Sequence, residues 1–162
     1  MKTAIYPGTF DPITYGHIDV IKKSLNIFDR VIVATTDNIN KNYHFSIEQR
    51  LSIINNSLFK DLKLNKKKIR VISFDILTID LCKKYKAGTI IRGLRAVSDF
   101  EYEFQLAGMN KKLNKGIETM FLMSDIENQI ISSKFVKEIA NLGGKIDRFV
   151  TKSTAKMLKG KF

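Results

Sequence analysis

The chain has 162 residues, of which 44% are hydrophobic, and it carries a formal net charge of +12 at neutral pH. This apolar content excludes a disordered chain and is typical of a globular protein that buries roughly 70% of its unfolded surface. No run approaches the ~20 apolar residues that a membrane span needs, so we expect no membrane contact. Cys82 is the one cysteine, which excludes an internal disulfide and a cysteine-based metal site.

The excess of positive charge comes mostly from lysine, with 22 Lys against 6 Arg along the whole chain. Specific nucleic-acid contacts rely on arginine and on aromatic side chains beside basic residues. We therefore expect no nucleic-acid partner, although a non-catalytic, basic nucleic-acid-binding protein stays open as an alternative. Because the chain opens on an apolar run rather than a charged leader, and has a single thiol, a cytoplasmic location is expected.

Apolar, β-branched runs alternate along the chain with segments whose apolar residues recur every three or four positions. The predicted strands are Lys2–Tyr6, Arg30–Thr36, Ile69–Phe74, Thr89–Ile91 and Glu118–Met123. The predicted helices are Gly16–Phe28, Ile47–Leu58, Thr78–Lys86, Asp99–Asn114, Ser133–Leu142 and Ser153–Lys159. This alternation predicts an α/β fold: a Rossmann-like, doubly wound, five-stranded and mostly parallel sheet with helices on both faces. We expect residues 1–162 to form a single domain whose C-terminal helix covers about 151–160.

A loop rich in Gly and Pro follows the first predicted strand and ends in Gly16 and His17, at the start of the first predicted helix. Free backbone N–H groups at a helix N-terminus favour an anion, most often a phosphate. Gly8 and Gly16 let the backbone approach a ligand closely, and His17 adds a hydrogen-bond donor or a positive charge. No Gly-Lys-Ser/Thr follows, and the loop does not match G-x-G-x-x-G. The segment predicts a phosphate site that contains a catalytic group.

Two further segments suit anions and follow other predicted strands. Arg92 and Arg95 flank Gly93 at the end of the fourth strand, where two arginines beside a glycine favour an anion clamp. Ser132 and Ser133 bring hydroxyl and N–H groups to the start of a helix, a second anion site. Because ligands of such folds bind at the carboxyl ends of the strands, we expect these segments to converge on one pocket.

The run Tyr-Pro-Gly-Thr-Phe-Asp-Pro-Ile-Thr-Tyr-Gly-His at 6–17 resembles the nucleotidylyltransferase superfamily, whose short signature is matched by Thr14-Tyr15-Gly16-His17. Together with Arg-Gly-Leu-Arg at 92–95 and Ile-Ser-Ser at 131–133, it resembles the bacterial-type members that act on 4′-phosphopantetheine. The resemblance implies adenylyl transfer from ATP to 4′-phosphopantetheine, giving dephospho-coenzyme A and pyrophosphate, the penultimate step of coenzyme A biosynthesis. It also implies a homohexamer and a Mg²⁺ ion carried by ATP, with no metal ligand from protein side chains. Transfer to nicotinamide mononucleotide or a polyol phosphate is the nearer alternative.

The resemblance also implies roles for individual residues. His17 would stabilise the transition state at the ATP α-phosphate, Lys41 would hold the attacking phosphate, and Arg95 would neutralise the departing pyrophosphate. The implied ATP-binding residues are Thr9, Phe10, His17, Gly93, Leu94, Arg95, Glu103, Asn128, Gln129, Ile130, Ile131, Ser132, Ser133 and Lys134. The implied 4′-phosphopantetheine-binding residues are Thr9, Lys41, Leu77, Thr78 and Arg92. Ser124, Asn128 and Lys134 depart from the family pattern, which predicts a looser adenine pocket.

Overall fold

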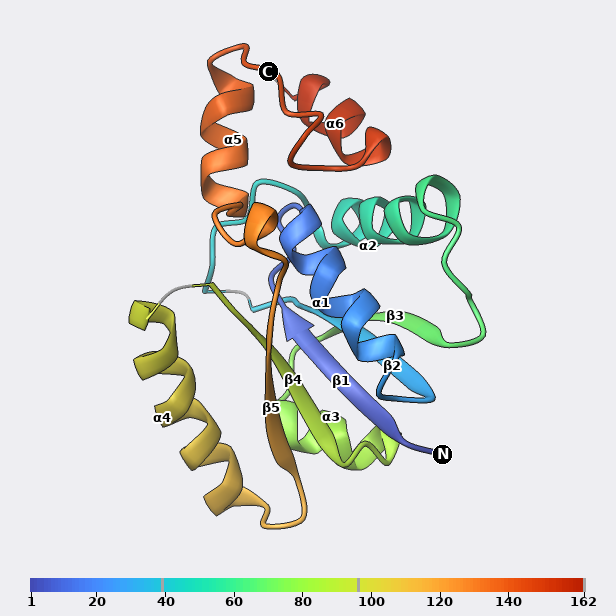
Figure 1. The fold of residues 1–162 in the computed structure, drawn as a ribbon, viewed down its shortest axis with the longest axis vertical. Helices are drawn as coiled ribbons and strands as arrows, with labels where there is room; N and C mark the ends of the chain where they lie inside the picture. Colours follow the sequence, from blue (N-terminus) through green and yellow to red (C-terminus); the bar gives the residue numbers. More distant parts are fainter. Residues whose placement is uncertain (39, 96, 162) are drawn as a thin grey trace.

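The computed structural model describes residues 1–38, 40–95 and 97–161, with residues 97 and 98 described by their backbone only. It contains a five-stranded sheet in the order β3-β2-β1-β4-β5, in which every pair of neighbours is parallel (Figure 1). The strands are β1 Thr3–Gly8, β2 Arg30–Thr36, β3 Ile69–Phe74, β4 Thr89–Leu94 and β5 Glu118–Met123. The predicted Rossmann-like α/β fold is therefore confirmed. Its strand order reverses between β1 and β4, and such a switch point is where open α/β sheets bind ligands.

Three of the strands have their predicted bounds, whereas β1 and β4 are longer than predicted. Pairing continues to Gly8 opposite Thr35 of β2, and to Leu94 opposite Met123 of β5. The apolar runs end earlier, so the sequence pattern placed Gly8 and the segment after Ile91 in loops. Their position inside hydrogen-bonded strands gives these two segments a rigid backbone beside the switch point.

In the described part of the chain, six α-helices connect and follow the strands: α1 Tyr15–Leu25, α2 Ile47–Asn55, α3 Thr78–Tyr85, α4 Val97–Leu113, α5 Ser133–Asn141 and α6 Lys152–Lys159. α2 begins at a capping box, in which the Ser46 hydroxyl accepts from the Gln49 N–H at 3.3 Å and the Gln49 side chain accepts from the Ser46 N–H at 3.0 Å. The predicted helix Ile47–Leu58 changes at Asn56 into a π-helical turn, Asn56–Asp61, and a short 3₁₀ turn covers Ile126–Asn128. Neither turn was predicted, because neither repeats the α-helical period.

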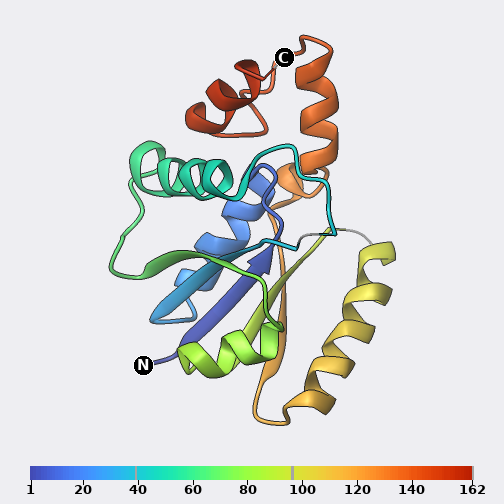
Figure 2. The ribbon, with the colours of Figure 1, turned by 180° about the vertical axis from the view of Figure 1, so that it is seen from behind.

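The two faces of the sheet are covered by different helices, as alternate side chains of β1 show. Ala4 and Tyr6 belong to a buried core with Ile18 of α1, and Ile5 belongs to a second core with Ile79 of α3. Figure 1 shows α1 in front of the sheet. Figure 2, seen from the opposite side, shows α3 covering the other face. Within the described residues, no helix combines the length and the apolar character needed to cross a membrane.

Candidate active site

A cavity of about 570 Å³ lies at the carboxyl ends of β1 and β4. Its walls come from the loop after β1, the first turn of α1, the loop after β2, the end of β4 and the start of α5. The predicted site residues that line it are Thr9, Phe10, His17, Lys41, Arg92, Gly93, Leu94, Arg95, Glu103, Ile131, Ser132, Ser133 and Lys134. Segments far apart in the sequence therefore meet at the switch point, as expected for one shared pocket.

Five predicted site residues do not line this cavity: Leu77, Thr78, Asn128, Gln129 and Ile130. Leu77 and Thr78 lie at the start of α3, where the Leu77 side chain is largely exposed. The Asn128 side chain instead donates to Asp19 Oδ2 of α1 at 2.6 Å, and the Gln129 side chain donates to a backbone carbonyl at 3.2 Å. Their ligand contacts stay predictions.

His17 occupies the first turn of α1, and the hydrogen bonds of its ring select one tautomer. The backbone N–H of Thr14 donates to His17 Nδ1 at 3.0 Å. An amide N–H can only donate, so Nδ1 must be unprotonated and the neutral ring carries its proton on Nε2. Burial, and then the charge of Arg95, lowers the pKa of His17 to about 4. Of the two roles open to His17 in the sequence, the structure favours a neutral donor over a cation.

The low pKa of His17 predicts that the protein loses stability as the pH falls. The unfolded chain protonates His17 near pH 6.5 while the folded chain keeps it neutral to about pH 4, so this stabilisation is complete above pH 6.5. This stabilisation is lost on acidification. By about pH 5 the free energy of unfolding should be lower by roughly 2 kcal/mol. Urea unfolding of the wild type and of His17→Asn at several pH values measures it. Parallel pH curves for the two proteins would contradict the assignment.

The ring of His17 is held by an aromatic side chain from the preceding loop. Phe10 is 1% exposed, and its ring contacts those of Tyr6 and His17 edge to face, with centroids 5.3 and 5.1 Å apart. Phe10 has a φ of +47°, an uncommon value for a bulky residue, and a Cβ atom on Gly8 would lie 2.9 Å from its ring. The last position of β1 thus needs glycine, because the Phe10 ring occupies the space that a side chain at position 8 would enter.

Arg92 forms a bidentate ion pair with Glu103 in the cavity wall. Its Nε donates to one carboxylate oxygen at 2.7 Å, its Nη2 donates to the other at 2.6 Å, and its Nη1 donates to the Pro7 carbonyl at 3.1 Å. Burial alone would lower the pKa of Arg92, but the hydrogen bonds and charge of Glu103 outweigh burial and raise it. The guanidinium is therefore a permanent cation in a fixed orientation at the end of β4.

The two serines at the start of α5 make different contacts. The Ser132 hydroxyl accepts from the Phe135 N–H at 3.1 Å and caps the helix, while the Ser133 hydroxyl donates to the Pro12 carbonyl at 2.7 Å. The second bond ties α5 to the loop after β1. The N-terminus of α5 and that of α1 therefore border the same cavity, so both helix dipoles favour a bound anion.

Sequence reasoning assigned no role to several residues that line the cavity: Tyr6, Asp11, Thr14, Val20, Asn42, Tyr43, Asp99, Ser124 and Lys137. Lys137 Nζ lies 3.3 Å from Asp11 Oδ2. It follows Ser133 by four residues, which places both on one face of α5, and this spacing could have revealed it. Asp11, Tyr43 and Asp99 had no comparable signal, because their proximity depends on how loops from different strands pack.

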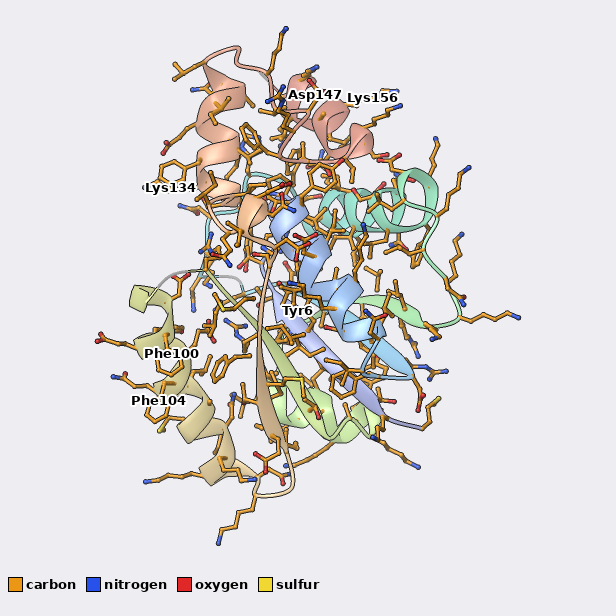
Figure 3. The ribbon with its side chains drawn as sticks, viewed as in Figure 1. Tyr6, Phe100, Phe104, Lys134, Asp147 and Lys156 are labelled. Carbon is orange, nitrogen blue, oxygen red and sulfur yellow. The ribbon has the colours of Figure 1, made fainter. Side chains whose placement is uncertain are left out.

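Positive charge dominates the cavity lining, which includes Lys41, Arg92, Arg95, Lys134 and Lys137 against the carboxylates of Asp11, Asp99 and Glu103. Each of these carboxylates has a cationic neighbour. Asp11 lies 3.3 Å from Lys137, Asp99 lies 3.4 Å from Arg95, and Glu103 lies 2.6 Å from Arg92. Figure 3 labels Lys134 at the N-terminal end of α5. In the described part of the chain, no group of three or more His, Cys, Asp or Glu side chains could hold a metal ion. The cavity is suited to polyanions such as phosphates.

Comparison with known proteins agrees with this geometry. Residues 5–139 match the family model described as cytidylyltransferase-like. The structure of the nicotinic acid mononucleotide adenylyltransferase of Plasmodium falciparum has a TM-score of 0.73 to this chain and 18% sequence identity. The match covers 98% of this chain and 94% of that protein. The match to this family model, together with the fold, therefore identifies a nucleotidyltransferase of the cytidylyltransferase-like class.

Two sequence relatives narrow this class. A protein of Pelagibacter ubique (strain HTCC1062), named phosphopantetheine adenylyltransferase, is 68% identical over 161 residues, which cover 99% of this chain and 98% of the relative. A protein of the same name from Caldanaerobacter subterraneus subsp. tengcongensis is 48% identical and covers 100% of this chain and 98% of its own length. The chain belongs to the phosphopantetheine adenylyltransferase family.

Proposed function

We propose that this enzyme transfers the adenylyl group of ATP to 4′-phosphopantetheine, giving dephospho-coenzyme A and pyrophosphate. The observation that carries the proposal is the cationic cavity at the switch point, which the buried, neutral ring of His17 lines together with the N-termini of α1 and α5. A phosphate oxygen of the acceptor attacks the α-phosphorus in line and forms a new O–P bond. The bond from that phosphorus to the β-phosphate oxygen breaks, and pyrophosphate leaves with the electron pair.

His17 stabilises the transition state of this displacement in the proposal. Negative charge builds on the equatorial oxygens of the α-phosphorus, and the Nε2–H of the neutral ring donates to one of them. The bond from the Thr14 N–H to Nδ1 and the contact with Phe10 support this role, because both hold the ring in one orientation. A preorganised donor needs no reorganisation when the charge develops, so the step needs no covalent intermediate.

The other cations divide between the two substrates. We assign Thr9, Lys41 and Arg92 to the phosphate of 4′-phosphopantetheine, and Leu77 and Thr78, which follow β3 at the same edge of the sheet, to its uncharged arm. We assign Gly93, Leu94 and Arg95 to binding of the ATP phosphates. The N-terminus of α5 is assigned to the same phosphates. The convergence of the parallel ends of β1, β2, β3 and β4 on this edge supports the division, because separate loops can then contact separate substrates.

Mg²⁺ enters the proposal as the counterion of ATP, where it neutralises phosphate charge. A Mg²⁺ ion held by the protein does not fit the donor set of the cavity. Asp11 accepts from two backbone N–H groups and pairs with Lys137, while Glu103 uses both oxygens for Arg92. Asp99 pairs with Arg95 at 3.4 Å, so each of these three cavity carboxylates is already engaged by a cation.

We further propose a homohexamer located in the cytoplasm. Apolar side chains on α4 support an assembly, because Phe104, Met109 and Leu113 are each more than half exposed. Figure 3 labels Phe100 and Phe104 on this helix, and their rings lie 5.8 Å apart. Such exposed apolar patches are typical of protein–protein interfaces. Light scattering after size exclusion should give six times the chain mass of 18.5 kDa, whereas the mass of one chain would contradict the assembly.

Pyrophosphate release tests the reaction. The wild type is supplied with ATP, Mg²⁺ and one acceptor at a time: 4′-phosphopantetheine, nicotinamide mononucleotide or glycerol 3-phosphate. We expect pyrophosphate, and dephospho-coenzyme A as the second product, with 4′-phosphopantetheine only. Turnover with another acceptor would show that the acceptor is wrong. No turnover with any of them, combined with salt-dependent binding of DNA, would favour the non-catalytic alternative.

A further inference from the structure

Arg50 of α2 is a buried cation to which the proposed reaction gives no role. Its side chain is 0% exposed, and it is the largest of the fully buried side chains in the described residues. Its nearest carboxylate, that of Asp37, lies 3.5 Å from Nη2 and is about half exposed. Burying an arginine is costly unless hydrogen bonds replace its hydration. Its partners therefore indicate what the buried charge does.

Backbone carbonyls make up most of the contacts of the Arg50 guanidinium. Nη1 donates to the Thr36 carbonyl at 2.7 Å, and Nε donates to the Phe45 carbonyl at 3.2 Å. Thr36 ends β2, and Phe45 lies just before the cap of α2, so the segment between them is the loop that carries Lys41. One side chain thus fastens both ends of this loop.

The same guanidinium also contacts the loop after β1. Its Nη1 donates to the Thr9 carbonyl at 3.1 Å and to Thr35 Oγ1 at 3.0 Å, and Thr35 Oγ1 donates to the Thr9 carbonyl at 2.9 Å. Its central carbon lies 3.9 Å from the ring centroid of Tyr43, which lines the cavity. Arg50 therefore lies directly beneath the cavity and joins the bases of the two loops that present Thr9 and Lys41.

We propose that Arg50 is a positioning residue for the acceptor phosphate: it sets the loop that carries Lys41 against Thr9. This inference rests on the proposed function, which assigns both residues to the phosphate of 4′-phosphopantetheine. The planar guanidinium donates from Nε and Nη1 in fixed directions, whereas the ammonium of lysine is a single rotatable donor group, so lysine retains the charge but not the geometry. Misplacement of a reacting group by about 1 Å can cost about 10²-fold in rate.

The structure also indicates that a lysine variant can fold. Asp11 holds the end of the loop independently, because its carboxylate accepts from the backbone N–H groups of His44 at 2.7 Å and Phe45 at 2.9 Å. In Arg50→Lys this attachment remains, while the bonds from one guanidinium to Thr36 and Thr9 are lost. The effect should therefore fall on the alignment of the two loops rather than on the whole fold.

For Arg50→Lys we expect the KM for 4′-phosphopantetheine to rise about tenfold or more, while the KM for ATP stays near the wild-type value. Arg70→Lys is the matched control, because Arg70 lies on β3 against Tyr85 and outside the cavity. Thr154→Val controls for stability, because it breaks a buried hydroxyl contact with Ser57 at 3.1 Å on α6 without touching the cavity. Equal changes in both KM values, or a Thr154→Val protein that matches Arg50→Lys, would reduce Arg50 to a structural role and overturn the inference.

A second pair of variants keeps the test decisive if Arg50→Lys does not fold. Thr35 is buried but does not line the cavity, and its hydroxyl links Arg50 to Thr9. Thr35→Val should raise the KM for 4′-phosphopantetheine severalfold, and Thr35→Ser, which keeps the hydroxyl, should restore it. Unchanged KM values in Thr35→Val would overturn the link between the two loops.

Limited trypsin digestion gives a readout that does not depend on the reaction. Trypsin cleaves after lysine, and Lys41 lies in the loop that Arg50 fastens. Cleavage after Lys41 should be faster than in the wild type for Arg50→Lys or Thr35→Val, and unchanged for Arg70→Lys. Unchanged cleavage in the first two proteins would overturn the inference even if turnover is observed. Faster cleavage without wild-type turnover on 4′-phosphopantetheine would instead uphold the loop attachment and overturn the proposed substrate.

Discussion

Replacing His17 by alanine is expected to lower kcat for adenylyl transfer by roughly 10²–10³-fold, while ATP still binds. The ring lies in the cavity in its neutral form, with Nδ1 occupied by the Thr14 N–H and the proton on Nε2. In the proposed mechanism its donor acts on charge that develops in the transition state, so its loss should affect kcat more than the affinity for ATP. Pyrophosphate release and calorimetric binding of ATP measure the two quantities.

Two further variants at this position distinguish a neutral donor from a cation. His17→Asn keeps a neutral N–H donor near the ring position, whereas His17→Lys supplies a charge. If donation by Nε2–H is what matters, the asparagine protein should retain more activity than the alanine protein, and lysine should not rescue. Greater activity in the lysine protein than in the asparagine protein would contradict the neutral form. Loss of ATP binding in all three would indicate a binding role only.

Replacing Arg92 by methionine is expected to lower the free energy of unfolding by about 3–5 kcal/mol. Glu103 is 8% exposed and forms two short hydrogen bonds with Arg92, so the variant leaves a buried carboxylate without its cation. Breaking one side of such a pair costs more than removing both sides, because the remaining charge has lost its hydration. Urea unfolding at neutral pH measures the loss.

The double variant Arg92→Met with Glu103→Met is the matched comparison. It should recover much of the lost stability, since no buried charge remains, but its KM for 4′-phosphopantetheine should stay high because the phosphate-binding cation is absent. If Arg92→Met lowered the free energy of unfolding by less than about 1 kcal/mol, the pair would behave like a weak surface ion pair. That result would contradict a strong stabilising interaction between Arg92 and Glu103. Recovery of the KM in the double variant would contradict the assignment of Arg92 to the acceptor.

The carboxylates of the cavity orient the arginines that are assigned to the phosphates of both substrates. Glu103 and Asp99 each lie beside an arginine that is also assigned to a phosphate, at 2.6 and 3.4 Å. The ion pairs orient these arginines before a substrate arrives, which reduces the ordering cost of binding. A phosphate then adds to a preorganised cation, and the cavity keeps the excess positive charge that attracts two anionic substrates.

Local signals in the chain were sufficient for most of the strands and helices and for the main segments that border the cavity. The bounds of β2, β3 and β5 follow from β-branched, apolar runs, and the start of α2 follows from the reciprocal bonds of Ser46 and Gln49. Positions such as Gly8 and His17 were recognisable because a Gly/Pro loop before a helix has few other uses. These signals depend only on neighbours within a few residues, so the sequence alone contains all the information that they need.

Only the tertiary structure decided which groups meet around the cavity and which protonation form His17 takes. Nothing near Arg50 in the sequence indicates that one guanidinium joins the Thr9 loop to both ends of the Lys41 loop. The contact of Lys137 with Asp11 likewise joins segments more than a hundred residues apart. The neutral state of His17, on α1, also depends on burial and on Arg95, which directly follows β4. Desolvation and Coulomb interactions act through space, so residue order alone did not determine them.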